Sequence, residues 1–265
     1  MLKNITDKKR LVVEDAKEQR LLKDLLKTIA PGNFAFSKAI KKAEWTLIAE
    51  CKLASPAKGE LCTGYSVPEL AQIYTENGAV ALSIHTDSHF RGSLEDIAAV
   101  RAVTHLPILR KDFIIDAYQI YEARVAGADA ILLIANILSD EQLKEYLSIA
   151  HGLGMDCLVE VHTLEELKRV QQTPAPVIGI NNRNLQTFTT DIQNTFDLLP
   201  HCDKYRIIIS ESGVSTGNEA DRLKQAGVRG ILVGEGLVKA SDIGKKVREL
   251  ARLEAAHQIF VRRFV

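Results

Sequence analysis

The sequence is poor in the features that mark secreted, zinc-binding or membrane-spanning proteins. It has only four cysteines, Cys51, Cys62, Cys157 and Cys202, without a CxxC pair, and no histidine cluster has zinc spacing. We therefore expect four reduced, packed thiols, no metal and a cytoplasmic protein. No apolar run approaches the ~20 residues that cross a bilayer. The first 28 residues are charged throughout and lack the apolar segment of a secretory signal.

An excess of charge of either sign is also missing. The 34 Lys and Arg residues balance the 34 Asp and Glu residues, so the net charge is zero. Nothing global draws this chain to nucleic acid or to an anionic membrane, and we expect neither as a partner. An anionic small molecule must then be bound by a local site. The sequence leaves a monomer and a weak homodimer equally open.

What the sequence does contain is a series of short runs rich in Val, Ile, Leu and Ala. There are eight such runs: Trp45–Cys51, Val80–Ile84, Pro107–Leu109, Ala128–Ile134, Cys157–Val161, Val177–Ile180, Arg206–Ile209 and Gly230–Val233. Near-continuous apolar runs are typical of strands buried on both faces of a parallel sheet. Segments with helical spacing lie between them, and several end at glycine. Eight strand–helix units predict an α/β protein with a single (β/α)₈ TIM barrel.

The first 44 residues do not fit this repeating unit. Residues 5–28 are predicted to form one charged amphipathic helix, ended by Pro31-Gly32, and a weaker segment runs to Lys42. The expected apolar stripe of that helix is Leu11, Leu21, Leu22, Leu25 and Leu26. We therefore expect one domain, 1–265, with a helical extension over 1–44 and a barrel core over 45–250.

Ionisable residues follow the apolar runs repeatedly, where the catalytic groups of such barrels lie. Strand side chains alternate, so Glu50 and Lys52 share a face and Cys51 points away from it. Burial raises the pKa of a carboxylate and a nearby lysine lowers it, which is how a general acid or base is tuned. Each charge alone would be an ordinary ion pair. Together, the strand ends that carry Glu50, Lys52, Lys111, Glu160 and Asn181 predict a catalytic site at one end of the barrel.

Glycine-containing turns follow the last two strands. Ser212-Gly213 follows the seventh strand and Gly234-Glu235-Gly236 the eighth. The loops after these two strands form the usual phosphate site of such barrels, where backbone N–H groups meet the oxygens. We therefore predict phosphate contacts from Gly213, Gly234 and Glu235, with Lys52 or Ser55 reaching in from the first loop.

Five segments resemble one enzyme family. Ile48–Gly59 resembles the first-strand signature of indole-3-glycerol phosphate synthases, and Leu109–Asp116 is close to identical to their third-strand motif. Leu158–His162, Ile178–Leu185 and Ser210–Val214 follow in the family's order. The resemblance covers roughly residues 5–255. The chain departs from the family pattern at Cys51, Leu53, Ala57 and Glu235, and at His85, which occupies a position where an apolar residue is usual.

The resemblance implies the substrate 1-(2-carboxyphenylamino)-1-deoxyribulose 5-phosphate of tryptophan biosynthesis. Its ring closure to indole-3-glycerol phosphate releases carbon dioxide and water, and calls for no metal or cofactor. By this likeness Lys111 is the general acid and Glu160 the general base or the stabiliser of an intermediate. Glu50 and Lys52 correspond to a second acid/base pair that assists the loss of water and contacts the phosphate end.

The resemblance also implies substrate-binding residues. Asn181, Arg183 and Ser55 would hold the anthranilate carboxylate and the substrate hydroxyls, and Ser212 would bind through its loop. The aromatic ring needs an apolar slot, for which the candidates are Pro56, Phe90, Phe113, Leu132 and Leu185.

Three other functions stay open for a barrel with these residues. A sugar-phosphate isomerase would want an inward Cys or Asp at the end of the first strand, where this chain has Glu50 and Lys52. A Schiff-base aldolase would use Lys111 or Lys52 as its nucleophile. A phosphate-ligand binding protein would need no buried acid/base set.

Overall fold

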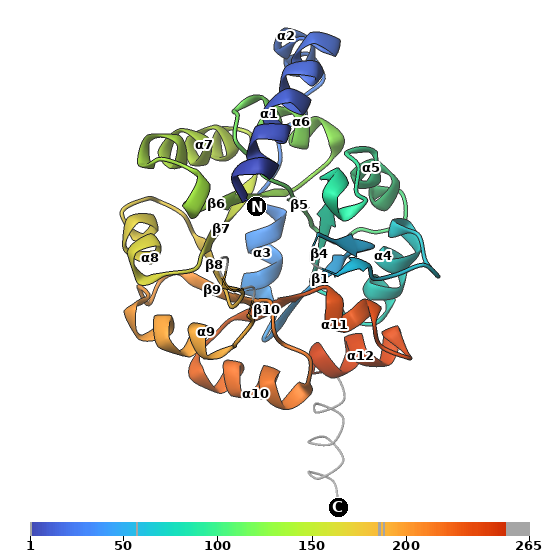
Figure 1. Ribbon diagram of the computed structural model, residues 1–265, viewed down its shortest axis with the longest axis vertical. Helices are drawn as coiled ribbons and strands as arrows, with labels where there is room; N and C mark the ends of the chain where they lie inside the picture. Colours follow the sequence, from blue (N-terminus) through green and yellow to red (C-terminus); the bar gives the residue numbers. More distant parts are fainter. Residues whose placement is uncertain (1, 57, 185–186, 188, 253–265) are drawn as a thin grey trace, which may run out of the picture.

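Eight parallel strands close into a barrel in the order β1-β10-β9-β8-β7-β6-β5-β4 (Figure 1). The computed structural model describes residues 2–56, 58–184, 187 and 189–252. The barrel strands are β1 (Thr46–Cys51), β4 (Ala81–His85), β5 (Ile108–Lys111), β6 (Ala130–Ile134), β7 (Asp156–Val161), β8 (Val177–Asn181), β9 (Ile207–Glu211) and β10 (Gly230–Val233). The predicted TIM barrel is confirmed. A short antiparallel hairpin of β2 (Ala54–Ser55) and β3 (Gly59–Glu60), which the apolar pattern did not predict, follows β1.

Helices surround the barrel (Figure 1). They are α4 (Val67–Glu76), α5 (Glu95–Arg101), α6 (Tyr118–Ala126), α7 (Asp140–Gly152), α8 (Leu164–Gln171), α9 (Gln193–Leu198), α10 (Gly217–Ala226), α11 (Glu235–Val238) and α12 (Ile243–Leu250). Short 3₁₀ turns η1 (Ser88–Phe90), η2 (Ala135–Ile137) and η3 (Leu199–His201) join some of them to their neighbours. Gly127 and Gly227 end α6 and α10 at φ values of 100° and 102°, so the predicted glycine caps are confirmed there. None of the described helices has the length and apolarity needed to cross a membrane.

The alternation of side chains separates an inner from an outer core. Ile48, Leu109 and Leu158 pack inside the barrel, whereas their strand neighbours pack against the surrounding helices. Cys51 is buried in the outer core, as its strand position predicted. Residues two positions beyond the inner apolar ones therefore point into the barrel near the carboxyl ends of the strands. The alternation thus directs Glu50 toward the barrel axis.

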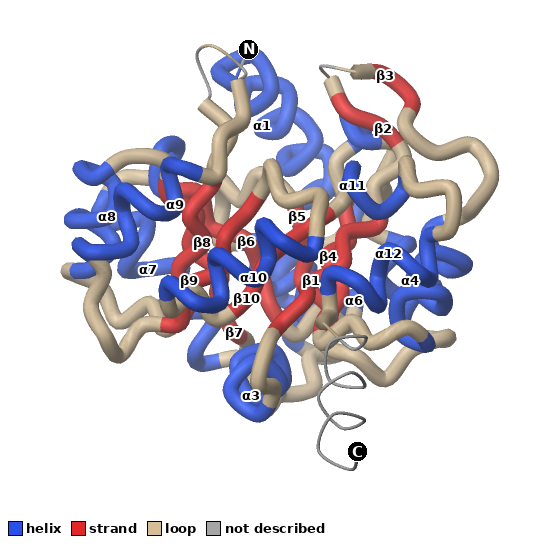
Figure 2. The backbone as a smooth tube through the Cα atoms, turned by 90° about the horizontal axis from the view of Figure 1, so that it is seen from below, coloured by secondary structure: helices blue, strands red, loops and turns tan. Residues whose placement is uncertain are grey.

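The amino ends of the strands are closed by α3 (Ala35–Lys42). Phe36 and Ile40 of this helix are fully buried in the inner core. The backbone N–H of Ser37 donates to Asp156 Oδ2 at 2.8 Å, which ties α3 to the start of β7. Figure 2 shows α3 at the opposite end of the barrel from α1 and the β2–β3 hairpin.

The carboxyl ends are partly covered by α1 (Leu2–Gln19), which is followed by α2 (Leu22–Leu26). The prediction of one helix over 5–28 was wrong, because the chain is extended at Leu21 (ψ 144°). The predicted stripe was also wrong: Leu25 is buried, whereas Leu11, Leu21, Leu22 and Leu26 are 40–63% exposed.

The face of α1 that packs on the barrel has a charged residue at its centre. Ile5, Lys9 and Val13, spaced four apart, are all buried. Lys9 Nζ lies 2.6 Å from Asp87 Oδ2 and 2.7 Å from Asp112 Oδ1. The spacing of the leucines did not predict this face. A buried lysine could not be expected from local sequence, because the partners of Lys9 lie far along the chain.

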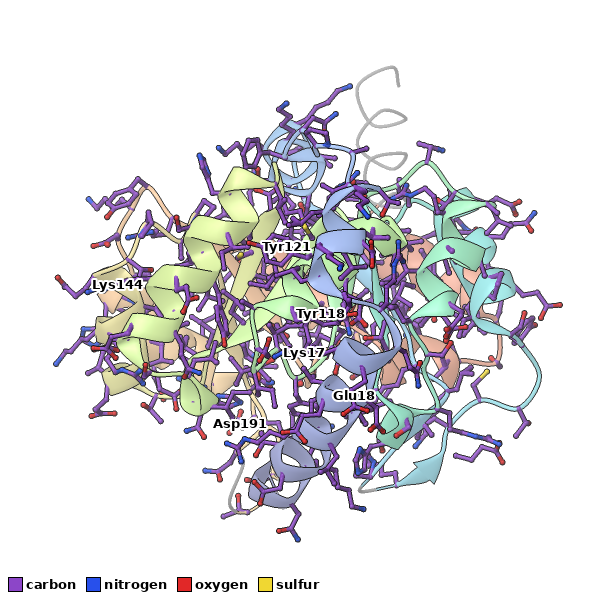
Figure 3. All side chains as sticks on the ribbon, turned by 90° about the horizontal axis from the view of Figure 1, so that it is seen from above. Lys17, Glu18, Tyr118, Tyr121, Lys144 and Asp191 are labelled. Carbon is purple, nitrogen blue, oxygen red and sulfur yellow. The ribbon has the colours of Figure 1, made fainter. Side chains whose placement is uncertain are left out.

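Farther along, α1 lies on α6. Tyr118 Oη donates to the carbonyl of Ala16 at 3.0 Å and to that of Arg20 at 2.8 Å, and Lys17 pairs with Asp116 at 2.6 Å. Figure 3 shows Lys17 and Tyr118 side by side at this contact. These bonds fix the end of α1 to the barrel.

Candidate active site

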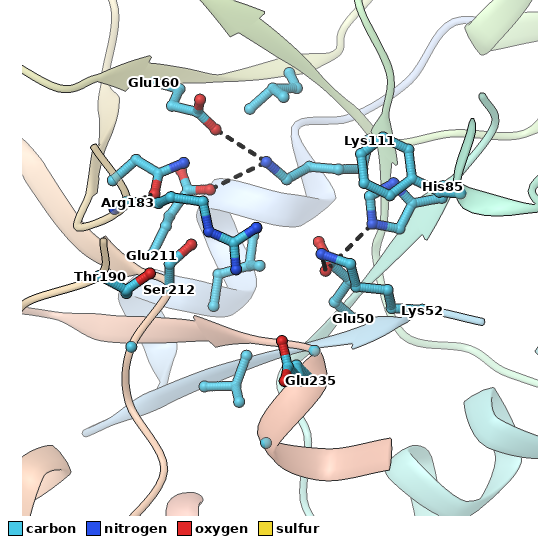
Figure 4. A pocket seen from close by; sticks show the side chains of 18 of the residues that line it. Glu50, Lys52, His85, Lys111, Glu160, Arg183, Thr190, Glu211, Ser212 and Glu235 are labelled. Carbon is cyan, nitrogen blue, oxygen red and sulfur yellow. Dashed lines mark hydrogen bonds and ion pairs between the residues drawn. The ribbon is translucent and has the colours of Figure 1, made fainter. Parts of the chain in front are cut away.

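A cavity of about 460 Å³ opens at the carboxyl ends of the strands (Figure 4). Fourteen of the predicted site residues line it: Glu50, Lys52, Pro56, Phe90, Lys111, Phe113, Leu132, Glu160, Asn181, Arg183, Ser212, Gly213, Gly234 and Glu235. Ser55 is buried but does not line the cavity, and its hydroxyl accepts from the backbone N–H of Lys58 at 3.2 Å. Leu185 lies outside the described residues.

Lys111 at the end of β5 is the centre of one charged cluster. Its Nζ lies 2.9 Å from Glu160 Oε2 on β7 and 3.2 Å from Glu211 Oε2 on β9 (Figure 4). Burial lowers the pKa of Lys111, but Glu160, Glu211 and Glu50 outweigh it and hold that pKa above its ordinary value. The side chain therefore carries a proton at neutral pH.

Glu160 and Glu211 both contact the ammonium of Lys111, but their pKa values shift in opposite directions. Burial raises the pKa of Glu160, but Lys111 and His162 bring it below its ordinary value. Burial raises the pKa of Glu211 to about 7, since Glu160 adds repulsion and Lys111 compensates only in part. The cluster therefore holds one firmly ionised carboxylate and one that exchanges its proton near neutral pH.

Glu50 is the centre of a second cluster, on β1. Its Oε1 lies 3.5 Å from Lys52 Nζ and 3.2 Å from His85 Nε2. Burial raises the pKa of Glu50, but His85, Lys52 and Lys111 bring it well below its ordinary value. Glu50 is thus a carboxylate at any pH near neutrality.

Glycines on neighbouring strands make room for these buried carboxylates. A Cβ on Gly234 would come within 2.5 Å of Glu50 Oε1, and one on Gly179 would collide with Glu211 Oε1. Any other residue at either position would displace a carboxylate from the cavity. Gly234 therefore has a steric role as well as its predicted place beside a phosphate.

The loops after β8 and β9 are tied together. Asn182 is buried and its Nδ2 donates to Ser210 Oγ at 2.9 Å and to the carbonyl of Ser212 at 2.8 Å. Ser212 has a φ of 65°, a strained value for a residue other than glycine, and Gly213 follows at 84°. The bond from Asn182 holds this turn where it lines the cavity.

One end of the cavity is rich in cations. Glu235, at the start of α11, pairs with Lys58 at 2.7 Å and with Lys239 at 2.8 Å, and all three side chains line the cavity. These two lysines did not stand out in the sequence. Together with Lys52 they give this end a local excess of positive charge.

An apolar wall lies beside the charged clusters. Phe90 and Phe113 face each other with ring centroids 6.4 Å apart, and the ring of His85 stacks on Phe90 at 4.2 Å. Ile5 of α1 also lines the cavity. These side chains give the cavity that Lys111 also lines an apolar, largely aromatic wall.

The sequence-based site lacked several of these groups. Glu211 and His85 lie two residues beyond Ile209 and Ser83 on their strands, so the alternation that placed Glu50 would have found both. His162 Nε2 lies 3.3 Å from Glu160 Oε1, and its Nδ1 lies 3.4 Å from Glu166 Oε2. Lys9 and Ile5 carried no local signal, because their role depends on the packing of α1.

Groups of this kind, collected at the carboxyl ends of barrel strands, move protons to and from a bound molecule. The fold and the cavity thus define a TIM-barrel enzyme of the acid–base type. Comparison with known proteins gives the family within this class.

A family model described as indole-3-glycerol phosphate synthase matches residues 2–250, and the chain belongs to that family. The indole-3-glycerol phosphate synthase of Endomicrobium trichonymphae is 42% identical over 255 residues, which cover 94% of this chain and 99% of that protein. The enzyme of the same name from Desulforamulus reducens is 48% identical over 218 residues, or 81% and 82% of the two chains.

A solved structure supports the fold alone. The 3-hexulose-6-phosphate synthase of Salmonella typhimurium has a TM-score of 0.64 and 14% identity, and the match covers 80% of this chain and 99% of that one. At this identity the likeness extends to the barrel and not to the chemistry.

Proposed function

We propose that this cavity performs the indole-3-glycerol phosphate synthase reaction, with Lys111 as the proton donor for ring closure. The reaction closes, decarboxylates and dehydrates 1-(2-carboxyphenylamino)-1-deoxyribulose 5-phosphate to indole-3-glycerol phosphate. The observation that carries the assignment of Lys111 is its ammonium, paired with Glu160 at 2.9 Å and Glu211 at 3.2 Å in a cavity with an aromatic wall. Proton delivery to the substrate carbonyl by a positioned acid lowers the barrier to attack by the aromatic ring.

Glu160 stabilises the intermediate that forms when the ring closes. Its carboxylate is held ionised by Lys111 and His162. A fixed negative charge stabilises the iminium that ring closure creates, and carbon dioxide then leaves with its electrons drawn into that iminium. Loss of carbon dioxide restores the benzene ring without a proton transfer, so Glu160 acts in this step as the stabiliser of the intermediate.

Glu50 and Lys52 serve the loss of water. They lie 3.5 Å apart, one as a carboxylate and the other as the cation beside it. Departure of a hydroxyl group needs a proton on the oxygen and a base for the neighbouring proton, and this pair supplies both. Lys52 also reaches toward the phosphate end.

Other residues of the cavity bind the substrate. Arg183 and Asn181 hold the carboxylate and hydroxyls, and Phe90, Phe113, Pro56 and Leu132 contact the ring. The turns at Gly213 and Gly234, with Glu235 through its backbone, take the phosphate beside Lys52. Ser55 supports the first loop through Lys58.

The ion pairs of Lys111 favour an acid over a Schiff-base nucleophile. An amine attacks a carbonyl only when it has lost its proton, and three carboxylates keep the proton on Lys111. This electrostatic setting distinguishes the proposed synthase from an aldolase on the same barrel.

The experiment is to add the carboxyphenylamino-deoxyribulose phosphate and follow indole fluorescence with time. The synthase gives growing fluorescence, whereas a flat trace from folded protein would indicate a phosphate-ligand binding protein. Treatment with borohydride during turnover is the second arm, and a covalent lysine adduct would contradict the role of Lys111. We further propose a cytoplasmic protein, monomeric or weakly dimeric, that works without metal or cofactor.

A further inference from the structure

His85 is a buried side chain of the cavity to which the proposed mechanism gives no role. It ends β4, where Ala81, Ser83 and His85 alternate into the barrel. The residue is 6% exposed and lines the cavity. A buried imidazole needs a polar partner, because an unpaired ring nitrogen costs free energy when it is removed from water.

The ring has one close polar neighbour, Glu50. Nε2 of His85 lies 3.2 Å from Glu50 Oε1. The angle of this contact is short of a well-aligned hydrogen bond, and Nε2 makes none to any other described residue. Phe90 stacks on the ring at 4.2 Å with an interplanar angle of 10°, which fixes the plane in which Nε2 points. Figure 4 shows the imidazole directed at the carboxylate.

Glu50 is therefore held from several sides. Lys52 approaches the same Oε1 at 3.5 Å, and Gly234 leaves the space that the carboxylate fills. Removal of His85 would leave the carboxylate with Lys52, a flexible side chain whose Nζ also lies 5.2 Å from the ring centroid of Phe90. The imidazole is the more rigid of the two partners.

The charges around His85 determine its state. Glu50 and Lys52 from the first strand and Lys111 from β5 face it. Burial lowers the pKa of His85 and outweighs the opposing effect of Glu50, so the ring is neutral near pH 7. A neutral imidazole can still donate one N–H to a carboxylate.

We propose that His85 is a positioning residue that holds the carboxylate of Glu50 in its working orientation through the 3.2 Å contact between Nε2 and Oε1, with Phe90 fixing the ring. The inference rests on the proposed role of Glu50 in the loss of water. It predicts that His85 affects the rate of a chemical step more than the affinity for substrate.

The first test compares His85→Leu, which removes the donor, with His85→Gln, which keeps an amide N–H at a similar reach. We expect His85→Leu to lower kcat roughly 10- to 100-fold, as loss of a hydrogen bond to a charged group does, with KM changed less than threefold. His85→Gln should recover kcat to within about threefold to fivefold of the original protein. His105→Leu, at an exposed histidine, is the matched control and should leave both constants unchanged.

Three results would overturn the proposal. Equal loss of kcat in both variants, or a rise in KM at constant kcat, would make His85 only a part of the aromatic wall of the cavity. Unchanged kcat in His85→Leu would make it a packing residue. Circular dichroism of each variant confirms that the barrel is folded, and His85→Gln keeps the test decisive if His85→Leu does not fold.

A double-mutant cycle with Glu50→Gln separates this inference from the proposed function. If His85 acts through Glu50, then His85→Leu should cost little in the Glu50→Gln background, and additive losses would contradict the proposal. Full turnover in Glu50→Gln alone would instead remove Glu50 from the mechanism. The two failures are therefore distinguishable.

Discussion

The two ends of this barrel are closed by helices in opposite ways. At the amino end, α3 inserts Phe36 and Ile40 into the inner apolar core. At the carboxyl end, α1 lies over the cavity and is anchored by Lys9 between Asp87 and Asp112. The apolar packing of α3 is nondirectional and excludes water. The ion pairs of Lys9 are directional, and one of them is made to Asp112, the residue next to Lys111. The difference separates the part of the barrel that stabilises the fold from the part that performs the chemistry.

The largest expected effect is at the carboxyl end. Lys111→Ala should lower kcat by about 10²- to 10⁴-fold while the protein stays folded and binds substrate, since it removes the general acid. Indole fluorescence measures the rate, and Lys144→Ala, at an exposed lysine, is the control. Turnover near that of the original protein would remove Lys111 from its role.

At the amino end the effect should fall on stability alone. Phe36→Ala removes a fully buried ring and should lower the free energy of unfolding by about 3–5 kcal/mol. Urea denaturation measures this loss, and kcat at 25 °C should stay within about twofold of the original protein. A large drop in kcat of the folded variant would show that the two ends are coupled and would weaken the comparison.

The pH dependence of stability should also distinguish the carboxyl end of the barrel, where Glu211 lies, from the apolar amino end. The folded-state pKa of Glu211 is raised to about 7, so its protonated form is favoured in the fold. This contribution to stability is full below the ordinary pKa of a glutamate and is lost as pH rises through about 7. The glutamine in Glu211→Gln cannot ionise, so this variant does not lose stability by this route as pH rises. The free energy of unfolding of the variant minus that of the original protein should therefore be larger at pH 8.5 than at pH 5.5. Urea midpoints at the two pH values check this, and parallel changes in both proteins would contradict it.

The smallest expected effect on kcat is that of a substitution at Cys51, which lies on β1 and packs against the surrounding helices. Cys51→Ser should leave kcat within about twofold, because the side chain faces the outer core. A serine hydroxyl there lacks a partner and should cost about 1 kcal/mol of stability. Loss of turnover in the folded variant would mean that the strand alternation is assigned to the wrong face.

Strand periodicity and the order of loops made much of the fold and of the site predictable. Each apolar run became a strand, and the same alternation that placed Glu50 in the cavity also placed Cys51 outside it. Local pattern could not show which face of α1 is buried, because Lys9 is accommodated only by carboxylates about 80 and 100 positions away. Contacts of that range come from packing, which sequence spacing does not report.

His85 and Glu211 were missed for a different reason. Each is the last residue of its strand, where the alternation of side chains points inward. The prediction from sequence relied on the residues that follow the apolar runs and did not extend each run to its last inward position. Counting inward positions from the apolar core of each strand would have found both. The motif likeness was sufficient for the family and not for every side chain of the cavity.

The spaces above Gly179 and Gly234 have a consequence for protein engineering. Each carboxylate occupies the volume where the adjacent strand lacks a side chain, Glu211 at Gly179 and Glu50 at Gly234. A designer who grafts the acidic and basic residues onto another barrel must therefore transfer these two gaps as well. A graft that leaves alanine at either place would carry the right functional groups in the wrong positions.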